Sequence, residues 1–191
     1  MLLRCLLLLT IATTLTTAFV LPANTVQNLD DCSPPNGTDK QMHWWQCSSG
    51  PVQFLNATPY DSSGKNYEYP IHLSKPIVVK TIINNPKTTY SSPNLKNTVN
   101  IWKYGGWNGC AWSSIPTLGL LKDLDACTHG VPCPIKPGMG EELDVVVDFT
   151  QFEQIIALLK DNQPYQLEYI LHDTVTGDDS CLMVQAWAFL K

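Results

Sequence analysis

The chain has 191 residues, 44% of them hydrophobic, and a formal net charge of −5 at neutral pH. This length fits one domain and is sufficient to bury a sizeable core. The 17 acidic residues outnumber the 12 basic ones, and the only arginine is Arg4. Because binding to phosphate backbones relies on clustered lysine and arginine, this composition argues against a partner that is a nucleic acid.

Residues 1–18 are predicted to be a secretory signal peptide. Arg4 precedes a short leucine-rich run, and the small residues at Thr16–Ala18 are typical of a signal-peptidase cleavage site. The run is interrupted by threonines and falls short of the roughly 20 apolar residues that a membrane span requires. We therefore expect export to the extracellular fluid or the lysosomal lumen. A polar N-terminal extension is expected over residues 19–43, and the main domain over residues 44–191.

The cysteine count predicts disulfides. The sequence has seven cysteines, and the loss of Cys5 with the signal peptide would leave Cys32, Cys47, Cys110, Cys127, Cys133 and Cys181. In an oxidising compartment this even number predicts that all of them are paired. Two Asn-X-Thr sequons also place predicted N-glycosylation sites at Asn36 and Asn56.

Short segments of β-type composition follow one another along the main domain. In chain order, the expected strands cover residues 52–57, 77–83, 98–104, 143–149, 165–172 and 181–190. The strand at 143–149 is the clearest, because apolar residues at its odd positions alternate with Asp144 and Asp148. Residues 176–179 form an expected hairpin turn before the last strand. Many short strands separated by turns predict an all-β, two-sheet antiparallel sandwich.

Two short helices are expected to interrupt the strands. Thr150 and Glu153 have the spacing of a capping box, and the apolar residues that follow, up to Leu159, fall on one helical face. A second helix is expected over residues 116–125, where Leu118, Leu121 and Leu124 recur at helical intervals.

The sequence offers no catalytic centre. None of the four histidines has a metal-ligand spacing with another, and no nucleophile elbow or phosphate loop occurs. Cys127, His129 and Cys133 favour a disulfide over a zinc site in an exported chain. The acidic pairs at 141–142 and 178–179 lie beside turns, where charges are usually solvated. We therefore expect no enzyme activity, no metal and no cofactor.

Large aromatic and aliphatic residues gather outside the clearest strands. Trp102, Trp107 and Trp112 lie close together in the sequence and are followed by Leu118 and Leu121. Two interpretations remain open: a packed loop core, or the mouth of an apolar pocket, for which tryptophan supplies large area with few rotatable bonds.

Several motifs in order resemble the ML lipid-recognition family. Residues 44–47 (WWQC) resemble the family's first aromatic-flanked cysteine, and residues 127–135 resemble its central C-x5-C-P loop. Residues 136–138 resemble the basic-then-glycine turn that follows it. Residues 162–167 resemble the entry to its penultimate strand, and Cys181 resembles its last-strand cysteine. The resemblance covers residues 44–191, and the stretch after Cys110 looks more like the family's ganglioside activator than its sterol carrier.

The resemblance implies an immunoglobulin-like sandwich whose two sheets hold a lipid tail in an apolar cavity. It also implies pairing of Cys47 with Cys181 and of Cys127 with Cys133, which leaves Cys32 with Cys110. The main competing arrangement pairs Cys32 with Cys181 and Cys47 with Cys110. The predicted lipid-contacting residues are Val79, Trp102, Trp107, Trp112, Leu118, Leu121, Val145, Val147, Phe149, Leu167, Tyr169, Leu171 and Val184.

The function implied by the resemblance is non-enzymatic: the protein would extract, carry or present a membrane glycolipid, phospholipid or sterol. Its partners would be the lipid, a membrane surface contacted transiently, and a lysosomal hydrolase or membrane receptor. The alternatives are a secreted sandwich with a solid interior that binds a protein receptor, and an accessory protein that docks a lipid hydrolase. A cavity between the sheets distinguishes the first alternative from a carrier.

Overall fold

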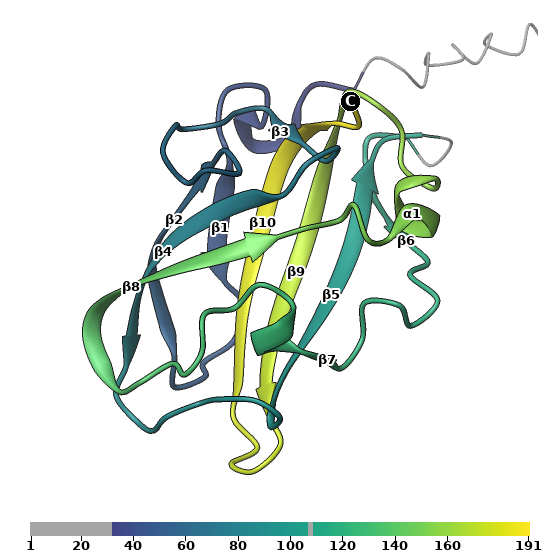
Figure 1. Ribbon diagram of the computed structural model, residues 1–191. Coiled ribbons are helices and arrows are strands. Elements are labelled where there is room, and N and C mark those ends of the chain that lie inside the picture. Colours follow the sequence, from purple (N-terminus) through teal and green to yellow (C-terminus); the bar gives the residue numbers. More distant parts are fainter. Residues whose placement is uncertain (1–31, 107–108) are drawn as a thin grey trace, which may run out of the picture.

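Segments of alternating apolar and polar residues form the β-strands of the computed structural model, which describes residues 32–106 and 109–191 (Figure 1). The predicted signal peptide, most of the predicted extension, and Trp107 lie outside these residues. The strands are β1 (His43–Gln46), β2 (Gln53–Tyr60), β3 (Ile71–His72), β4 (Ile77–Asn85), β5 (Leu95–Tyr104), β6 (Trp112–Ile115), β7 (Leu124–Asp125), β8 (Gly138–Val147), β9 (Gln163–Asp173) and β10 (Asp179–Phe189). The helical elements are the 3-10 turns η1 (Pro35–Gly37) and η2 (Ala126–Thr128) and the α-helix α1 (Glu153–Ile156).

The strands form two sheets that pack face to face. The larger sheet has the order β1-β10-β9-β5-β6, with β3 added to β10 and β7 added to β5. The smaller sheet has the order β2-β4-β8. All pairs are antiparallel except β3 with β10. The predicted all-β sandwich with a short α-helix is therefore confirmed.

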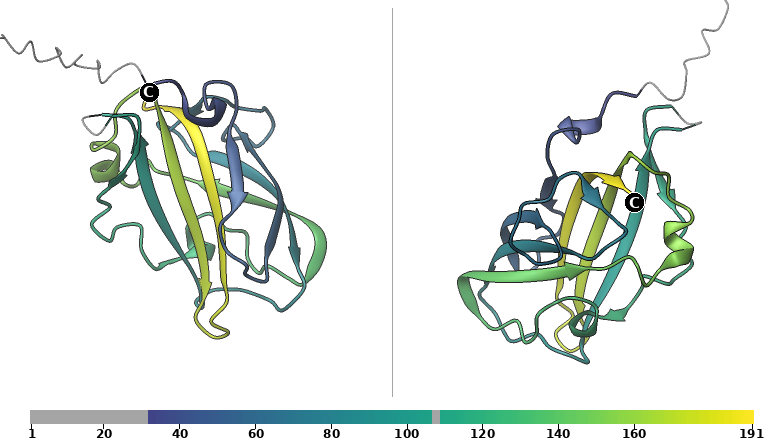
Figure 2. Two further views of the ribbon diagram at one scale, coloured as in Figure 1. Left: turned by 180° about the vertical axis from the view of Figure 1, so that it is seen from behind. Right: turned by 45° about the horizontal axis from the view of Figure 1, so that its top comes forward.

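The two sheets cross rather than run parallel. Strand β8 passes across the face of β10 and β9, and the view from behind shows the larger sheet on the opposite side of the molecule (Figures 1 and 2). Side chains at alternate positions of both sheets meet between them and form one hydrophobic core. Among the described residues, no helix is long and apolar enough to cross a membrane.

The helix expected over residues 116–125 does not form. Leu118 and Asp123 have positive φ angles of 52° and 53°, and the segment ends in β7. A positive φ interrupts a right-handed helix, so regular leucine spacing was not sufficient here. The predicted capping box is also wrong. Helix α1 begins at Glu153 without a side-chain cap, and the Thr150 hydroxyl instead donates to Asp148 Oδ1 at 2.6 Å.

The sulfur atoms are joined as Cys32–Cys110, Cys47–Cys181 and Cys127–Cys133, the pairs that the family resemblance implied. Cys47 follows β1 and Cys181 belongs to β10, so this bridge lies within the larger sheet. Cys32 ties the N-terminal segment to the loop between β5 and β6. Three disulfides are typical of an extracellular or luminal protein.

The Cys127–Cys133 loop covers the edge of the smaller sheet. Val146 in β8 donates its backbone N–H to the Gly130 carbonyl at 2.8 Å. Gly130 has a φ of +97°, and an added Cβ would lie 1.8 Å from the Val146 carbonyl oxygen. Only glycine fits this close approach, which joins the loop after β7 to β8.

Candidate functional site

An apolar cavity of about 100 Å³ lies between the two sheets. Strands β5, β9 and β10 line it from the larger sheet, and β2, β4 and β8 from the smaller one. The lining residues are Met42, Phe54, Ile71, Leu73, Ile77, Val79, Thr81, Val99, Ile101, Leu143, Val145, Val147, Phe149, Leu159, Tyr165, Leu167, Tyr169, Leu171, Leu182, Val184, Ala186 and Ala188.

Strand geometry explains why these side chains share one space. Successive strand residues point to opposite faces, so residues two apart share a face. The lining follows that period along residues 165–171 of β9, 182–188 of β10 and 143–147 of β8. Both sheets therefore turn a continuous apolar face toward the cavity.

The hydroxyls that line the cavity are engaged in hydrogen bonds. Thr81 Oγ1 donates to the Leu143 carbonyl at 2.7 Å, and Tyr165 OH donates to the Lys160 carbonyl at 2.6 Å. Tyr169 OH accepts from Asn97 Nδ2 at 3.1 Å. Burial raises the pKa of Tyr169 to about 12 and also raises that of Tyr165, so both phenols remain neutral at physiological pH. Hydrocarbon is the chemistry that such an interior accommodates best.

The cavity is small for a lipid tail. Pockets that hold small molecules usually measure about 300–1,000 Å³, so the sheets must move apart to admit a long chain. In the described part of the chain, no disulfide joins β2, β4 or β8 to the larger sheet. Separation of the sheets is therefore opposed by side-chain packing and by the connecting loops, not by a disulfide.

A second cleft, more polar than the apolar cavity and called the polar cleft, lies beside it. Its volume is about 210 Å³, and it runs along the edge where the Cys127–Cys133 loop covers β8. Val99, Val147, Phe149 and Tyr169 line both spaces. The remaining residues of the cleft are Asn97, Leu121, Leu124, Thr128, His129, Gly130, Val146, Asp148, Gln151 and Phe152.

Asp148 gives the cleft a negative charge. Burial raises the pKa of this carboxyl, but hydrogen bonds from Thr150 and Gln151 outweigh burial and lower it below the usual value. Thr150 donates through its backbone N–H at 2.9 Å and through its hydroxyl at 2.6 Å. The carboxylate is therefore ionised at neutral pH.

Eight of the predicted lipid-contacting residues line the apolar cavity. They are Val79, Val145, Val147, Phe149, Leu167, Tyr169, Leu171 and Val184. The alternation that sequence reasoning recognised in residues 143–149 and 165–171 accounts for most of them. It missed several lining residues in strands whose apolar character it did recognise, including Ile77, Ile101 and Leu182.

Four other predicted residues lie outside the apolar cavity, and Trp107 lies outside the described residues. Leu118 is 83% exposed, whereas Leu121 is buried and lines the polar cleft. Trp102 and Trp112 are absent from the cavity lining and occupy even positions on β5 and β6 that alternate with the buried Ile101 and Ile115. The expectation that Trp102 and Trp112 form the cavity mouth is thus corrected: these side chains lie on the opposite face of the sheet.

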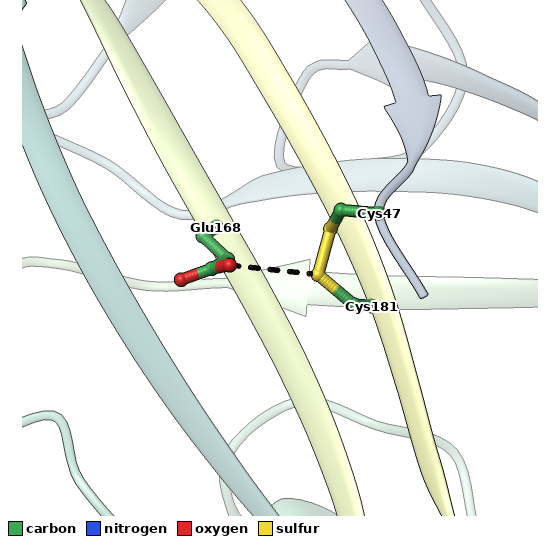
Figure 3. Close-up of side chains that lie close together, drawn as sticks. All are labelled: Cys47, Glu168 and Cys181. Carbon is green, nitrogen blue, oxygen red and sulfur yellow. Dashed lines mark hydrogen bonds between the residues drawn. A yellow bond between two sulfur atoms is a disulfide. The ribbon is translucent and has the colours of Figure 1, made fainter. Parts of the chain in front are cut away.

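No metal site forms among the candidate ligands of the described residues. Cys47, Glu168 and Cys181 lie close together, as Figure 3 shows, with Cys181 Sγ 3.8 Å from Glu168 Oε1. Both sulfurs are bonded to each other and carry no thiolate, so they offer a cation little. The same holds for Cys127 and Cys133 near His129.

The acidic pairs differ from each other. Residues 141–142 are exposed, as expected of solvated charges. Asp178 accepts from Lys87 Nζ at 2.6 Å and from Tyr90 OH at 2.9 Å, and the Lys87 contact contributes most to lowering the pKa of its carboxyl. Asp178 thus fastens the β9–β10 turn to the segment after β4.

The two predicted glycosylation sites are both exposed. Asn36 follows Pro35 in η1, and its Nδ2 donates to Gln185 Oε1 at 2.7 Å. Asn56 lies on β2, with its Nδ2 3.4 Å from Thr58 Oγ1. Glycosylation at both positions remains a prediction.

The fold and site define a β-sandwich with an apolar internal cavity. A comparison with solved structures finds a Niemann–Pick type C2 protein from the Japanese carpenter ant, with 15% sequence identity and a TM-score of 0.43. The match covers 76% of this chain and 98% of the ant protein. No family model and no curated protein matches the chain.

Proposed function

We propose that this protein is a non-enzymatic lipid carrier that holds the hydrocarbon tail of a membrane lipid between its sheets. The observation that carries the proposal is the apolar cavity, which both sheets line and whose hydroxyls are engaged within the protein. This cavity favours a carrier over a receptor-binding sandwich with a solid interior. The motifs that resemble the ML family support the same conclusion.

The energetics suit reversible transfer. Burial of a methylene group from water contributes about 0.8 kcal/mol. A membrane already shelters the tail from water, so exchange between bilayer and cavity is close to balanced. The work of parting the sheets adds a cost that favours release at the acceptor membrane. The expected setting is the extracellular fluid or the lysosomal lumen, and transient membrane contact is part of the proposed cycle.

The first test is native mass spectrometry of the secreted, disulfide-intact protein, followed by organic extraction. We expect a discrete added mass that extraction removes, and lipid analysis of the extract identifies its class. If the secreted protein carries no added mass, it is incubated with vesicles that contain a fluorescent long-chain alcohol. Failure to take up this lipid as well would overturn the proposal.

A cavity-filling variant connects uptake to the proposed site. Leu167→Trp adds volume inside the cavity, and we expect it to reduce uptake of the fluorescent long-chain alcohol at least tenfold while the protein stays folded. Trp112→Ala removes an aromatic ring from outside the cavity and is the matched control. Equal uptake by Leu167→Trp and the unaltered protein would argue against the cavity as the binding site.

A further inference from the structure

Asn97 is a polar residue on an otherwise apolar inner strand face. It lies on β5 between Leu95 and Val99, both buried, and is itself only 3% exposed. Its Nδ2 donates to Tyr169 OH at 3.1 Å. Its Oδ1 is buried and has no hydrogen-bond partner among residues 32–106 and 109–191. A buried acceptor without a partner destabilises the fold, so its presence calls for an explanation.

A second buried asparagine shows the usual arrangement. Asn85 is 0% exposed, and its Nδ2 lies 2.6 Å from the Thr88 carbonyl. Its Oδ1 accepts from the Lys87 backbone N–H at 3.2 Å. Both ends of this amide are satisfied within the protein, whereas one end of the Asn97 amide is not.

The position of Asn97 indicates which group its unpaired Oδ1 binds. Asn97 lines the polar cleft, and its partner Tyr169 lines both the cleft and the apolar cavity. A tail that occupies the cavity therefore leaves the head of the same molecule beside Asn97. Oδ1 becomes accessible when the sheets part to admit the tail, which couples recognition of the head to entry of the tail.

The cleft favours an uncharged head. The ionised carboxylate of Asp148 lines it, and no lysine does. A phosphate or a free carboxylate would therefore meet like charge with no lysine or arginine in the cleft lining to offset it. A hydroxyl can donate to a carbonyl oxygen and can also accept from neighbouring groups, so it suits the cleft best.

We propose that Asn97 Oδ1 accepts a hydrogen bond from an uncharged hydroxyl at the head of a single-chain amphiphile whose tail occupies the apolar cavity. This inference rests on the proposed carrier function. It narrows the ligand to neutral lipids that carry a hydroxyl, and it assigns Asn97 as the residue that reads the head group.

The test compares a long-chain fatty alcohol with its methyl ether. The two ligands share a tail and differ in one hydrogen-bond donor. Each is used to displace 1-aminoanthracene fluorescence from the unaltered, disulfide-intact protein. We expect the alcohol to bind about five- to tenfold more tightly, as one hydrogen bond to a buried acceptor warrants. Equal affinities overturn the inference but leave the carrier proposal intact, whereas binding of neither ligand counts against the carrier itself.

A variant pair assigns the preference to one residue. Asn97→Leu has a similar shape and lacks the acceptor, so we expect it to lose the preference for the alcohol while affinity for the ether is unchanged. Asn100→Leu makes the same change on the opposite face of β5, outside both the cleft and the cavity, and should retain the preference. A preference that survives in Asn97→Leu would overturn the assignment.

A measurement on the unaltered protein covers the case in which Asn97→Leu fails to fold. The side-chain amide resonances of Asn97 are followed by nuclear magnetic resonance during each titration. We expect the alcohol to shift them and the ether, at equal saturation, to shift them much less. Identical shifts for the two ligands would overturn the inference.

Discussion

The apolar cavity and the polar cleft share four side chains but differ in chemistry. On β5 the same inner face supplies both: Val99 and Ile101 line the cavity, and Asn97, one step earlier, lines the cleft. Asn97 pairs with Leu124 of β7, and residues of the Cys127–Cys133 loop line the cleft with it. The comparison shows that the period of a strand decides which residues point inward, whereas the neighbouring segment decides whether the inward residue can be polar.

The largest expected effect comes from a charge placed in the cavity. Val145→Asp puts a carboxyl where the residue is 8% exposed, and we expect a loss of at least about 3 kcal/mol in unfolding free energy. Its neighbour Val146 is 39% exposed, so Val146→Asp should cost under about 1 kcal/mol. Urea unfolding measures both. Similar losses would mean that the two faces of β8 do not differ as described.

Enlarging the cavity should lower the stability of the fold but raise its affinity for longer lipid tails. Leu171→Ala removes a lining side chain, and truncations of this kind cost about 2–5 kcal/mol. Leu95→Ala, at a position that is 3% exposed and lines neither space, should cost a similar amount. Only Leu171→Ala is expected to raise affinity for longer tails in the fluorescence assay. A gain in both variants would show that general loosening, not cavity volume, controls uptake.

The next prediction concerns the close contact between the Cys127–Cys133 loop and β8. Gly130→Ala places a methyl group against the Val146 carbonyl and should cost about 2–3 kcal/mol, because both the contact and the positive φ are disturbed. Gly140→Ala is the control, since its φ is +70° but nothing lies within 4 Å of the added atom. It should cost only about 1 kcal/mol. Thermal unfolding distinguishes them, and equal costs would indicate that the loop does not rest tightly on β8.

The smallest effect at neutral pH concerns Tyr169. Its folded-state pKa of about 12 exceeds the ordinary value of 10.0, so the unfolded chain loses this proton first as pH rises. The contribution of Tyr169 to stability is therefore constant below pH 10 and falls between pH 10 and pH 12. Tyr169→Phe should flatten this decline.

Tyr69, whose pKa burial also raises to about 12, provides a comparison outside the cavity. Bound lipid should delay the ionisation of Tyr169, followed by tyrosinate absorbance, and leave that of Tyr69 unchanged. A shift in Tyr69 alone would contradict the position of the ligand.

The sequence allowed prediction of the fold where alternation was regular. Residues 143–149 and 165–171 alternate so clearly that their inward faces, and through them most of the predicted lining, followed directly. The Cys127–Cys133 pair also followed, by resemblance, from its short spacing and the Cys-Pro that ends it. These features depend on neighbours in the chain, which a sequence displays.

The predictions were wrong or incomplete where contacts between distant segments decide which residues are buried or where a strand begins. Trp102 follows the inward Ile101, so its outward position was available from parity, but three clustered tryptophans suggested a common pocket. Asn97 was missed because the expected strand began at residue 98, one position too late. The positive φ angles of Leu118 and Asp123 fall on residues other than glycine, and Gly119, next to Leu118, was the one local sign of a turn there.

The arrangement of the disulfides also has a mechanical consequence. The larger sheet and its edges are cross-linked, but no disulfide of the described residues spans the gap between the sheets, which is held by packing, connecting loops and non-covalent contacts. Hydrostatic pressure acts on internal voids, and the volume change of unfolding scales with the void that is eliminated. The molecule should therefore be stiff within its larger sheet and compressible in the direction that brings the two sheets together. Filling by a lipid would remove the void and make the same protein harder to compress.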